Sequence, residues 1–207
     1  VRCFGTDHSG VGYASQTYAV AGVTQRISRI LADMCDYFIN LCVLKNHDIA
    51  GVTFSLKNHF GSCSNPGNLH IGYCDPFFAA LNALPPIRSK QVLSICDALW
   101  GIIAGGPGGA PQVAPRSFIV SRDPVAHDTV CAQEIGALGC KTLRYATHIV
   151  TASKTPYSLG VGDIGQIEVI RIHNPVLGVV ERGNENSAPE TFRVYQNFPN
   201  PFNAGTV

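Results

Sequence analysis

The sequence predicts an α/β fold, layered, with a largely parallel sheet flanked by helices and an extended β segment at the C-terminus. Three observations lead to this class. Short apolar runs of strand length alternate with stretches whose apolar residues recur at helical spacing. Asp-Pro pairs precede two of the helical stretches, and such a pair combines an N-cap with the residue favoured at the first helical position. This alternation of strands and helices is typical of a layered α/β domain.

The first 61 residues contain three expected elements after a Gly/Ser/Tyr-rich opening, Val1–Ala21, that we expect to be a loop or an edge strand. Apolar residues at helical spacing predict a helix over Val23–Cys35. The short apolar run Tyr37–Leu44 predicts a buried parallel strand. A second helix is expected over Ala50–Phe60, with Gly61 just beyond its C-terminal end.

The middle of the chain is predicted to contain a helix, a strand and a loop. Asp75-Pro76 begins the helix, which should end before Pro85 because the next two residues are both proline. Val92–Cys96 predicts another buried strand. Gly105–Pro111 (GGPGGAP) predicts a flexible loop with many exposed backbone amides.

The last predicted elements of the α/β domain follow in the same alternation. Ser117–Ser121 is expected to be a strand, and Asp123-Pro124 to open a helix that extends to Ile135. Leu143–Ala152 predicts a further helix. Gln166–Ile172 alternates well enough to predict a strand, and Val176–Glu181 follows it.

Charge is scarce in this chain. Its 207 residues include 15 basic and 14 acidic side chains, and charged residues make up 14% of the total, against about 25% in ordinary proteins. The net charge of +1 argues against nucleic acid or an anionic membrane as a partner. No run of about 20 apolar residues suggests a membrane span. Because the chain has few charged side chains to place on its surface, we expect partner chains or sugars to cover part of that surface.

Eight cysteines, none in a C-x-x-C motif, argue against a zinc ribbon or a thioredoxin-like site. They suit an oxidising compartment, where up to four disulfides could form. Cys63 and Cys74 flank a Gly/Asn/Pro-rich loop and are the best single candidate for a disulfide. The alternative, that the cysteines in apolar runs are buried thiols, is equally compatible with the sequence.

Several spaced motifs resemble the domain-of-unknown-function 362 family. They are Val43–Gly61 (VLKNHDIAGVTFSLKNHFG), Cys96–Leu99 (CDAL) with the following GGPGG, and Ser121–Asp128 (SRDPVAHD). The resemblance covers roughly residues 1–172, with the beginning of the family's domain expected to be missing. It implies an α/β fold and says little about activity. Some relatives carry iron–sulfur modules, but no such cysteine motif occurs here, and no cofactor is predicted.

The composition changes after residue 182, which gives a predicted organisation in three parts: an α/β domain over 1–182, a polar linker over 183–190, and an orphan strand over 191–207. Tyr195–Asn203 (YQNFPNPFN) resembles the opening strand of the Ig-like C-terminal sorting domain of the type IX secretion system. That resemblance implies export from a Bacteroidota-like bacterium to the outer cell surface or the medium.

A strand without a sheet of its own tends to add to an exposed sheet edge, on its own domain or on a neighbour. If it adds head-to-tail to a neighbour and the rotation does not close, a filament results. A frayed tail without a role is the alternative. The candidate assembly residues are Thr191, Phe192, Val194, Tyr195, Phe198 and Phe202.

Polar side chains near the ends of predicted elements form a candidate ligand pocket, because open α/β sheets bind ligands outside the carboxyl ends of their strands. Lysines and loop amides there would suit an anion or a metal. The simpler interpretation is structural: Asp123 is explained as an N-cap. The candidate ligand-binding residues are Lys45, His47, Lys57, Asn58, Asp97, Asp123 and Asp128.

Two functions from different classes follow. The first is an exported structural protein of the bacterial cell surface, a homo-oligomer or a filament protomer assembled by C-terminal strand donation. It accounts for the low charge and the orphan strand. O-linked glycans are compatible with it, since no N-glycosylation sequon occurs. The alternative is an enzyme that binds an anion, a metal or a redox cofactor in the polar pocket. No P-loop, G-x-S-x-G or H-E-x-x-H motif occurs, which favours a non-enzymatic role, and no metal site is predicted.

Overall fold

A four-stranded mixed sheet organises the molecule, and the predicted α/β class is confirmed. The computed structural model describes residues 3–172. The strand order is β4-β3-β5-β6, with β3 and β5 parallel and both outer strands antiparallel to their neighbours. The strands are β3 (Phe38–His47), β4 (Gly51–Thr53), β5 (Gln91–Ile102) and β6 (Ser117–Ser121). The predicted strands near residues 37–44, 92–96 and 117–121 are thus present, in a sheet where one of three pairings is parallel.

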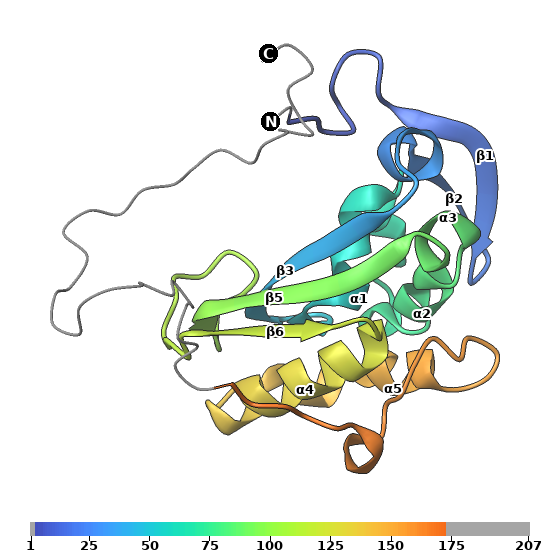
Figure 1. Cartoon of the computed structure of the whole chain (residues 1–207). Coiled ribbons are helices and arrows are strands. Elements are labelled where there is room, and N and C mark those ends of the chain that lie inside the picture. The colour runs from blue at the N-terminus through green and yellow to red at the C-terminus, as the bar shows by residue number, and fades with distance from the viewer. Residues whose placement is uncertain (1–2, 173–207) are drawn as a thin grey trace, which may run out of the picture. The chain divides into compact units, whose positions relative to one another are not determined.

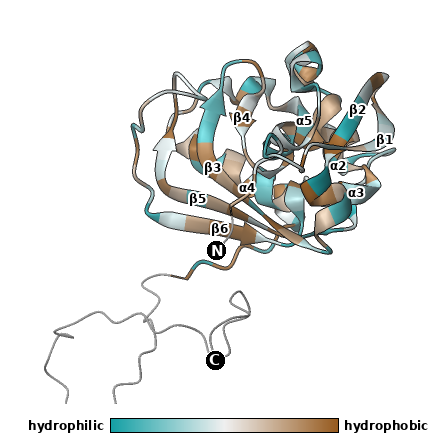
Figure 2. Ribbon diagram, turned by 90° about the horizontal axis from the view of Figure 1, so that it is seen from above, coloured by the Kyte–Doolittle hydropathy of each residue, from teal (hydrophilic) through white to brown (hydrophobic). Residues whose placement is uncertain are grey.

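The helices lie on one side of this sheet, as Figures 1 and 2 show. The longest, α4, begins where the sequence predicts, because the Asp123 carboxylate accepts hydrogen bonds from the amides of Val125 and Ala126 at 2.8 and 2.9 Å. The α-helices are α1 (Ser55–Asn58), α2 (Phe77–Asn82), α3 (Pro85–Arg88), α4 (Pro124–Ala137) and α5 (Thr147–Ser153).

A hairpin stands where the sequence predicts a helix over Val23–Cys35, and that prediction is wrong for most of its length. Strands β1 (Tyr13–Val20) and β2 (Val23–Ser28) pair antiparallel, and only a short π-helix, η1 (Ile30–Met34), follows. The two residues between the strands both have positive φ, 47° at Ala21 and 89° at Gly22, as a tight hairpin turn requires. Strand pairing has overridden the helical spacing of the apolar residues.

Other predicted elements differ as well. The helix expected to begin at Asp75-Pro76 begins at Phe77 without a side-chain cap, and the helix expected over Leu143–Ala152 divides into a 3-10 helix and α5. The segment 50–60, expected to be one helix, divides into β4, α1 and a 3-10 helix. Gly51 makes the first part possible, because its φ is 82° and a side chain there would collide with the backbone of Thr142 and Ala146. Residues 166–172, expected to be a strand, form none. The remaining 3-10 helices are η2 (His59–Ser62), η3 (Pro66–Leu69), η4 (Gly72–Cys74), η5 (Thr142–Tyr145) and η6 (Ile164–Gln166).

Chain contacts separate a body, Phe4–Glu168, from a unit made of Val1–Cys3 and Val169–Val207. The body contains every helix and strand named above. The predicted linker (183–190), orphan strand (191–207) and segment Val176–Glu181 lie outside the described residues.

The cysteines are unpaired. All eight lie within residues 3–172, and none forms a disulfide, so the expected Cys63–Cys74 bridge is not present. Both of these thiols are fully buried, and burial raises the pKa of each to about 11. The alternative expectation, that Cys35, Cys42, Cys96 and Cys131 are buried thiols, is confirmed for the last three, while Cys35 is half-buried.

Asp128 connects the two halves of the body. Its carboxylate, fully buried on α4, accepts hydrogen bonds from the amides of Ser55 and Leu56, the first two residues of α1, both at 2.9 Å. His127 Nδ1 lies 2.8 Å from the same carboxylate. Burial lowers the pKa of His127, but the hydrogen bond and charge of Asp128 outweigh it and raise that pKa above its usual value.

We expect Asp128→Ala to lower the free energy of unfolding by about 3 kcal/mol, because it leaves two buried amides and a buried imidazole without their acceptor. Urea denaturation measures the change. Asp33→Ala is the matched control, since Asp33 forms an exposed ion pair with Arg29 and its loss should cost at most about 1 kcal/mol. Equal losses in the two variants would contradict the anchoring role.

Candidate functional site

The face of the sheet turned away from the helices is apolar. The strand register defines it: Ile39 lies opposite Leu93, and Leu41 lies opposite Ile95, which in turn lies opposite Val120. Residues that are direct partners in a sheet point to the same face. We call this surface the outer face; it consists of Ile39, Leu41, Val43, Leu93, Ile95, Phe118 and Val120, together with Asp97.

These apolar side chains are open to solvent. Leu41 is 67% exposed, Phe118 60% and Val120 54%, and the hydrophobic colouring of β3, β5 and β6 is visible in Figure 2. Scattered exposed apolar residues are normal, but a contiguous patch of this kind marks a surface that another molecule covers. The outer face is therefore the strongest candidate for a functional surface in the described part of the chain.

The opposite face of the same strands combines apolar core residues, among them Cys42, Leu44, Cys96 and Ala98, with one polar row. Asn40, Ser94 and Ser121 lie in one row across β3, β5 and β6 and point toward the helices. Asn40 and Ser94 belong to a buried network in which Asn40 Nδ2 donates to the Ser55 carbonyl at 3.0 Å and Gln91 Nε2 donates to Ser94 Oγ at 2.9 Å. Both faces of the sheet are thus largely apolar. A sheet with this composition is suited to burial on both sides.

The edge of the sheet formed by β6 is also open. Strand β6 pairs with β5, and no strand of residues 3–172 pairs with its other side. An unpaired edge presents backbone donors and acceptors to which another strand can add. The outer face and this edge are adjacent, because Phe118 and Val120 of the outer face lie on β6.

The predicted ligand-binding residues do not meet in one pocket. Asp97 lies on the outer face, and its Oδ1 accepts a hydrogen bond from the Leu99 amide at 2.9 Å. The Asp128 carboxylate accepts hydrogen bonds from the two N-terminal amides of α1. Asp123 caps α4 and also accepts from the Val161 amide at 2.8 Å. Asn58 donates to the Asn40 side chain and to the Leu41 carbonyl. Each of these four has a structural role that accounts for it.

Three of the predicted residues, Lys45, His47 and Lys57, do lie in one region, near the carboxyl end of β3. His47 Nδ1 accepts hydrogen bonds from the amides of Ile49 and Ala50 at 3.1 and 3.2 Å. Burial lowers the pKa of His47 to about 4, and the charges of Lys57 and Lys45 act in the same direction. Burial also lowers the pKa of Lys57.

Sequence reasoning missed two histidines in this region. The ring of His70 stacks on that of His47 with centroids 5.9 Å apart, and His148 packs edge-on against Phe78 at 4.6 Å. His70 lies between the first and second predicted motifs and His148 follows the last, and no spacing connects either of them to Lys57. Only the folded chain brings them together.

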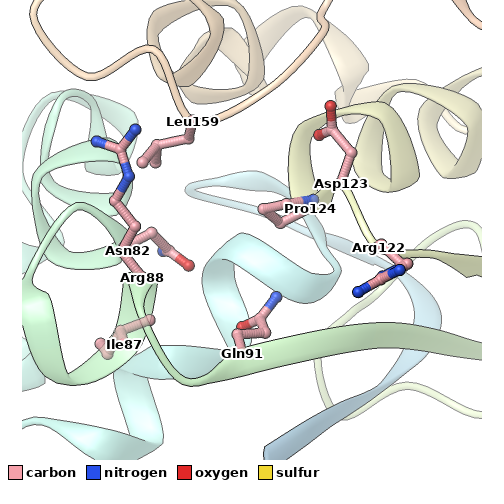
Figure 3. A pocket seen from close by; sticks show the side chains of 8 residues that line it. All are labelled: Asn82, Ile87, Arg88, Gln91, Arg122, Asp123, Pro124 and Leu159. Atoms are coloured by element: carbon pink, nitrogen blue, oxygen red, sulfur yellow. The ribbon is translucent and has the colours of Figure 1, made fainter.

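A separate cavity of about 400 Å³ opens between α3 and the start of α4 (Figure 3). Most of its polar groups already have partners: Arg88 donates to the carbonyls of Tyr157 and Ser158 at 3.3 Å, and Gln91 belongs to the buried network. Asp123 is the only predicted residue in its lining, which consists of Asn82, Ile87, Arg88, Gln91, Arg122, Asp123, Pro124 and Leu159.

Among residues 3–172, no three His, Cys, Asp or Glu side chains are grouped so that they could hold a metal ion. None of the helices in that range is long and apolar enough to cross a membrane.

The outer face makes a direct prediction about stability. Leu41→Ala should change the free energy of unfolding by about 0.5 kcal/mol or less, because Leu41 is mostly exposed. Leu44→Ala, on the same strand but fully buried, should cost about 3 kcal/mol. Chemical denaturation of a dilute sample compares the two. A large cost for Leu41→Ala at low protein concentration would show that the described body itself covers this face.

Buried histidines predict an acid-sensitive fold. Burial lowers the pKa of His59 to about 4, although a hydrogen bond with Gln91 opposes this, and lowers that of His148 to about 3. Between about pH 6.5 and pH 4, the unfolded chain therefore binds protons that the folded chain does not. The free energy of unfolding should fall as the pH falls through this window, by up to about 1.4 kcal/mol per pH unit for each histidine.

Urea denaturation at pH 7, 6 and 5 measures this slope. His59→Gln should flatten it, because one of the groups that take up a proton on unfolding is gone. His8→Gln, at an exposed position, is the control and should leave the slope as it is. An unfolding free energy independent of pH over this window would refute the assignment.

Comparison with known proteins identifies a family. No curated protein and no solved structure matches this chain. A family model described as "Domain of unknown function (DUF362)" matches residues 8–133, which is more than half of the sequence and includes the three motifs of the expected resemblance. The chain therefore belongs to the DUF362 family of domains of unknown function.

Proposed function

We propose that this chain is a self-associating structural protein of the bacterial cell surface, in which copies join through the outer face of the sheet and its open β6 edge. The single observation that carries the proposal is the outer face itself, seven apolar side chains on three adjacent strands. The occupant that we infer is a second copy of the chain, which can offer the same apolar surface.

The low charge of the chain supports this occupant. A stable interface buries about 800 Å² on each partner and has few charged residues at its centre. Asp97 is the only charged residue among the eight positions that define the outer face, and it lies at one end of the register. A partner rich in basic residues would find little to pair with on such a surface, whereas a second apolar face would be complementary.

The C-terminal segment supplies a way to extend the assembly. We propose that Thr191–Tyr195 (TFRVY) adds as a strand to the β6 edge of a neighbouring copy. These residues lie outside the described part of the chain, so the support is their alternating, β-favouring sequence and the open edge that β6 presents. Head-to-tail addition that does not close on itself would produce a filament.

Localisation is part of the same proposal. The likeness of Tyr195–Asn203 to the opening of a type IX sorting domain supports export to the cell surface, where O-linked sugars could cover further apolar area. No cofactor is part of this function. The enzymatic alternative is less well supported, because four of its seven residues have structural roles elsewhere in the body.

Charge on the outer face should prevent association. We expect wild-type protein to form oligomers whose mass rises with concentration, and Leu41→Lys or Phe118→Lys to shift it toward the monomer by more than about tenfold in dissociation constant, because each would bury an unpaired charge. Size-exclusion chromatography with light scattering gives the mass, and negative-stain microscopy the form. Val150→Lys is the matched control, since Val150 is similarly exposed, at 50%, on helix α5.

Deletion of residues 191–207 separates the two contacts. It should abolish filaments while leaving smaller oligomers formed through the outer face, with an unchanged urea midpoint for the body. Wild-type protein that remains monomeric at all concentrations would refute the proposal. Association that is equally weakened by Val150→Lys would place the interface elsewhere.

A further inference from the structure

Lys57 has a chemical environment that is unusual for a lysine. It lies on α1 with its side chain half-buried, and its Nζ is 4.9 Å from the centre of the Phe60 ring and 5.8 Å from that of Phe78. Within residues 3–172, no hydrogen bond or salt bridge joins Lys57 to a carboxylate. Buried lysines are normally paired, because an isolated ammonium loses its hydration.

Imidazoles surround the same two phenylalanines. His70 packs edge-on against Phe60 at 4.9 Å and stacks on His47, while His148 packs edge-on against Phe78. We call these groups, with Lys57, the Lys57 cluster: Lys57, His47, His70, His148, Phe60 and Phe78.

One member of this cluster is a buried polar group without a partner. His148 is 1% exposed, and its Nδ1 forms no hydrogen bond. A buried nitrogen without a partner is costly, and in native proteins such a group needs an explanation, of which a bound ion is one. Either ring nitrogen of a neutral imidazole can carry the hydrogen, so His148 Nδ1 can act as a donor. Among residues 3–172, neither the Lys57 ammonium nor His148 Nδ1 has a hydrogen-bond partner, and both side chains pack against Phe78.

The backbone beside the cluster is strained. Tyr73 and Cys74 both have left-handed conformations, with φ of 59° and 66°, which is costly for residues other than glycine. The Cys74 thiol is close enough to Lys57 for the two groups to affect each other's ionisation. Strain of this kind is retained where the surrounding structure positions a site.

We propose that the Lys57 cluster is a binding site for a small oxyanion of the phosphate or carboxylate class. Lys57 supplies the charge, and His148 donates through Nδ1. One bound oxyanion would satisfy both unpartnered donors. A cation would be repelled by Lys57 and Lys45, and the described residues contain no grouping suited to a metal. This site is independent of the outer face, which lies on the other side of the sheet.

Protection of Lys57 from acetylation tests the site. The chain contains only five lysines, Lys45, Lys57, Lys90, Lys141 and Lys154, so peptide mass spectrometry can follow each one. Inorganic phosphate should slow acetylation of Lys57 about fivefold at a concentration four times the dissociation constant, by mass action. Lys141 and Lys154 should be unaffected. Sodium chloride at matched ionic strength controls for screening.

Thermal unfolding provides the second measurement. Phosphate should raise the Tm of wild-type protein in a saturable way, and Lys57→Gln should abolish that rise while Lys141→Gln retains it. If Lys57→Gln does not fold, the acetylation result for wild-type protein decides alone. Equal protection by chloride and phosphate, or protection of all five lysines together, would overturn the proposal and leave Lys57 as a structural cation packed on two aromatic rings.

Discussion

The buried carboxylate of Asp128 is the interaction on which the body depends. Helix α1 has only four residues, too few to be stable on its own. Its first two backbone amides donate hydrogen bonds to the carboxylate of Asp128 on α4. A buried charge of this kind is tolerated only when hydrogen bonds surround it, and Asp128 has three, two from backbone amides and one from His127. The anchor fixes α1 and α4 on the same side of the sheet and so determines which face of the sheet remains open.

The covered face of the sheet contains a polar network in addition to its apolar core, whereas the open face is apolar. The covered side has Asn40 and Ser94 in a hydrogen-bonded network, and the open side has Leu41, Ile95 and Phe118. A polar network under a sheet requires all its members to be paired, which demands a defined geometry from the helices above it. The outer face requires only apolar contact, and this difference is why we place the association of subunits there and the oxyanion site on the helix side.

Local signals in the sequence predicted much of the fold. The strands β3, β5 and β6 contain the predicted apolar runs, although β5 continues to Ile102, beyond the expected end at Cys96. Helix α4 follows an Asp-Pro pair that fixes its start to the residue. The prediction of a helix over Val23–Cys35 is wrong because this segment pairs with β1. In the resulting strand, Val23, Gln25 and Ile27 are more buried than the residues between them. The outer face itself could not be predicted, because a sequence shows that both faces of a strand are apolar but not which of them the helices cover.

The prediction of a single ligand pocket was wrong because the contacts of its residues depend on segments far away in the sequence. Asp128 resembles a ligand-binding residue in the sequence, but its partners are 72 and 73 residues away. His148 has no motif to mark it, and its relevance depends on the contact with Phe78.

The Asp128 anchor also has a consequence for biosynthesis. On the ribosome, the amides of Ser55 and Leu56 are made long before the Asp128 carboxylate that they bond to, so the N-terminal end of α1 is anchored only after α4 has been made. Such long-range closure slows folding and extends the time during which chaperones are needed.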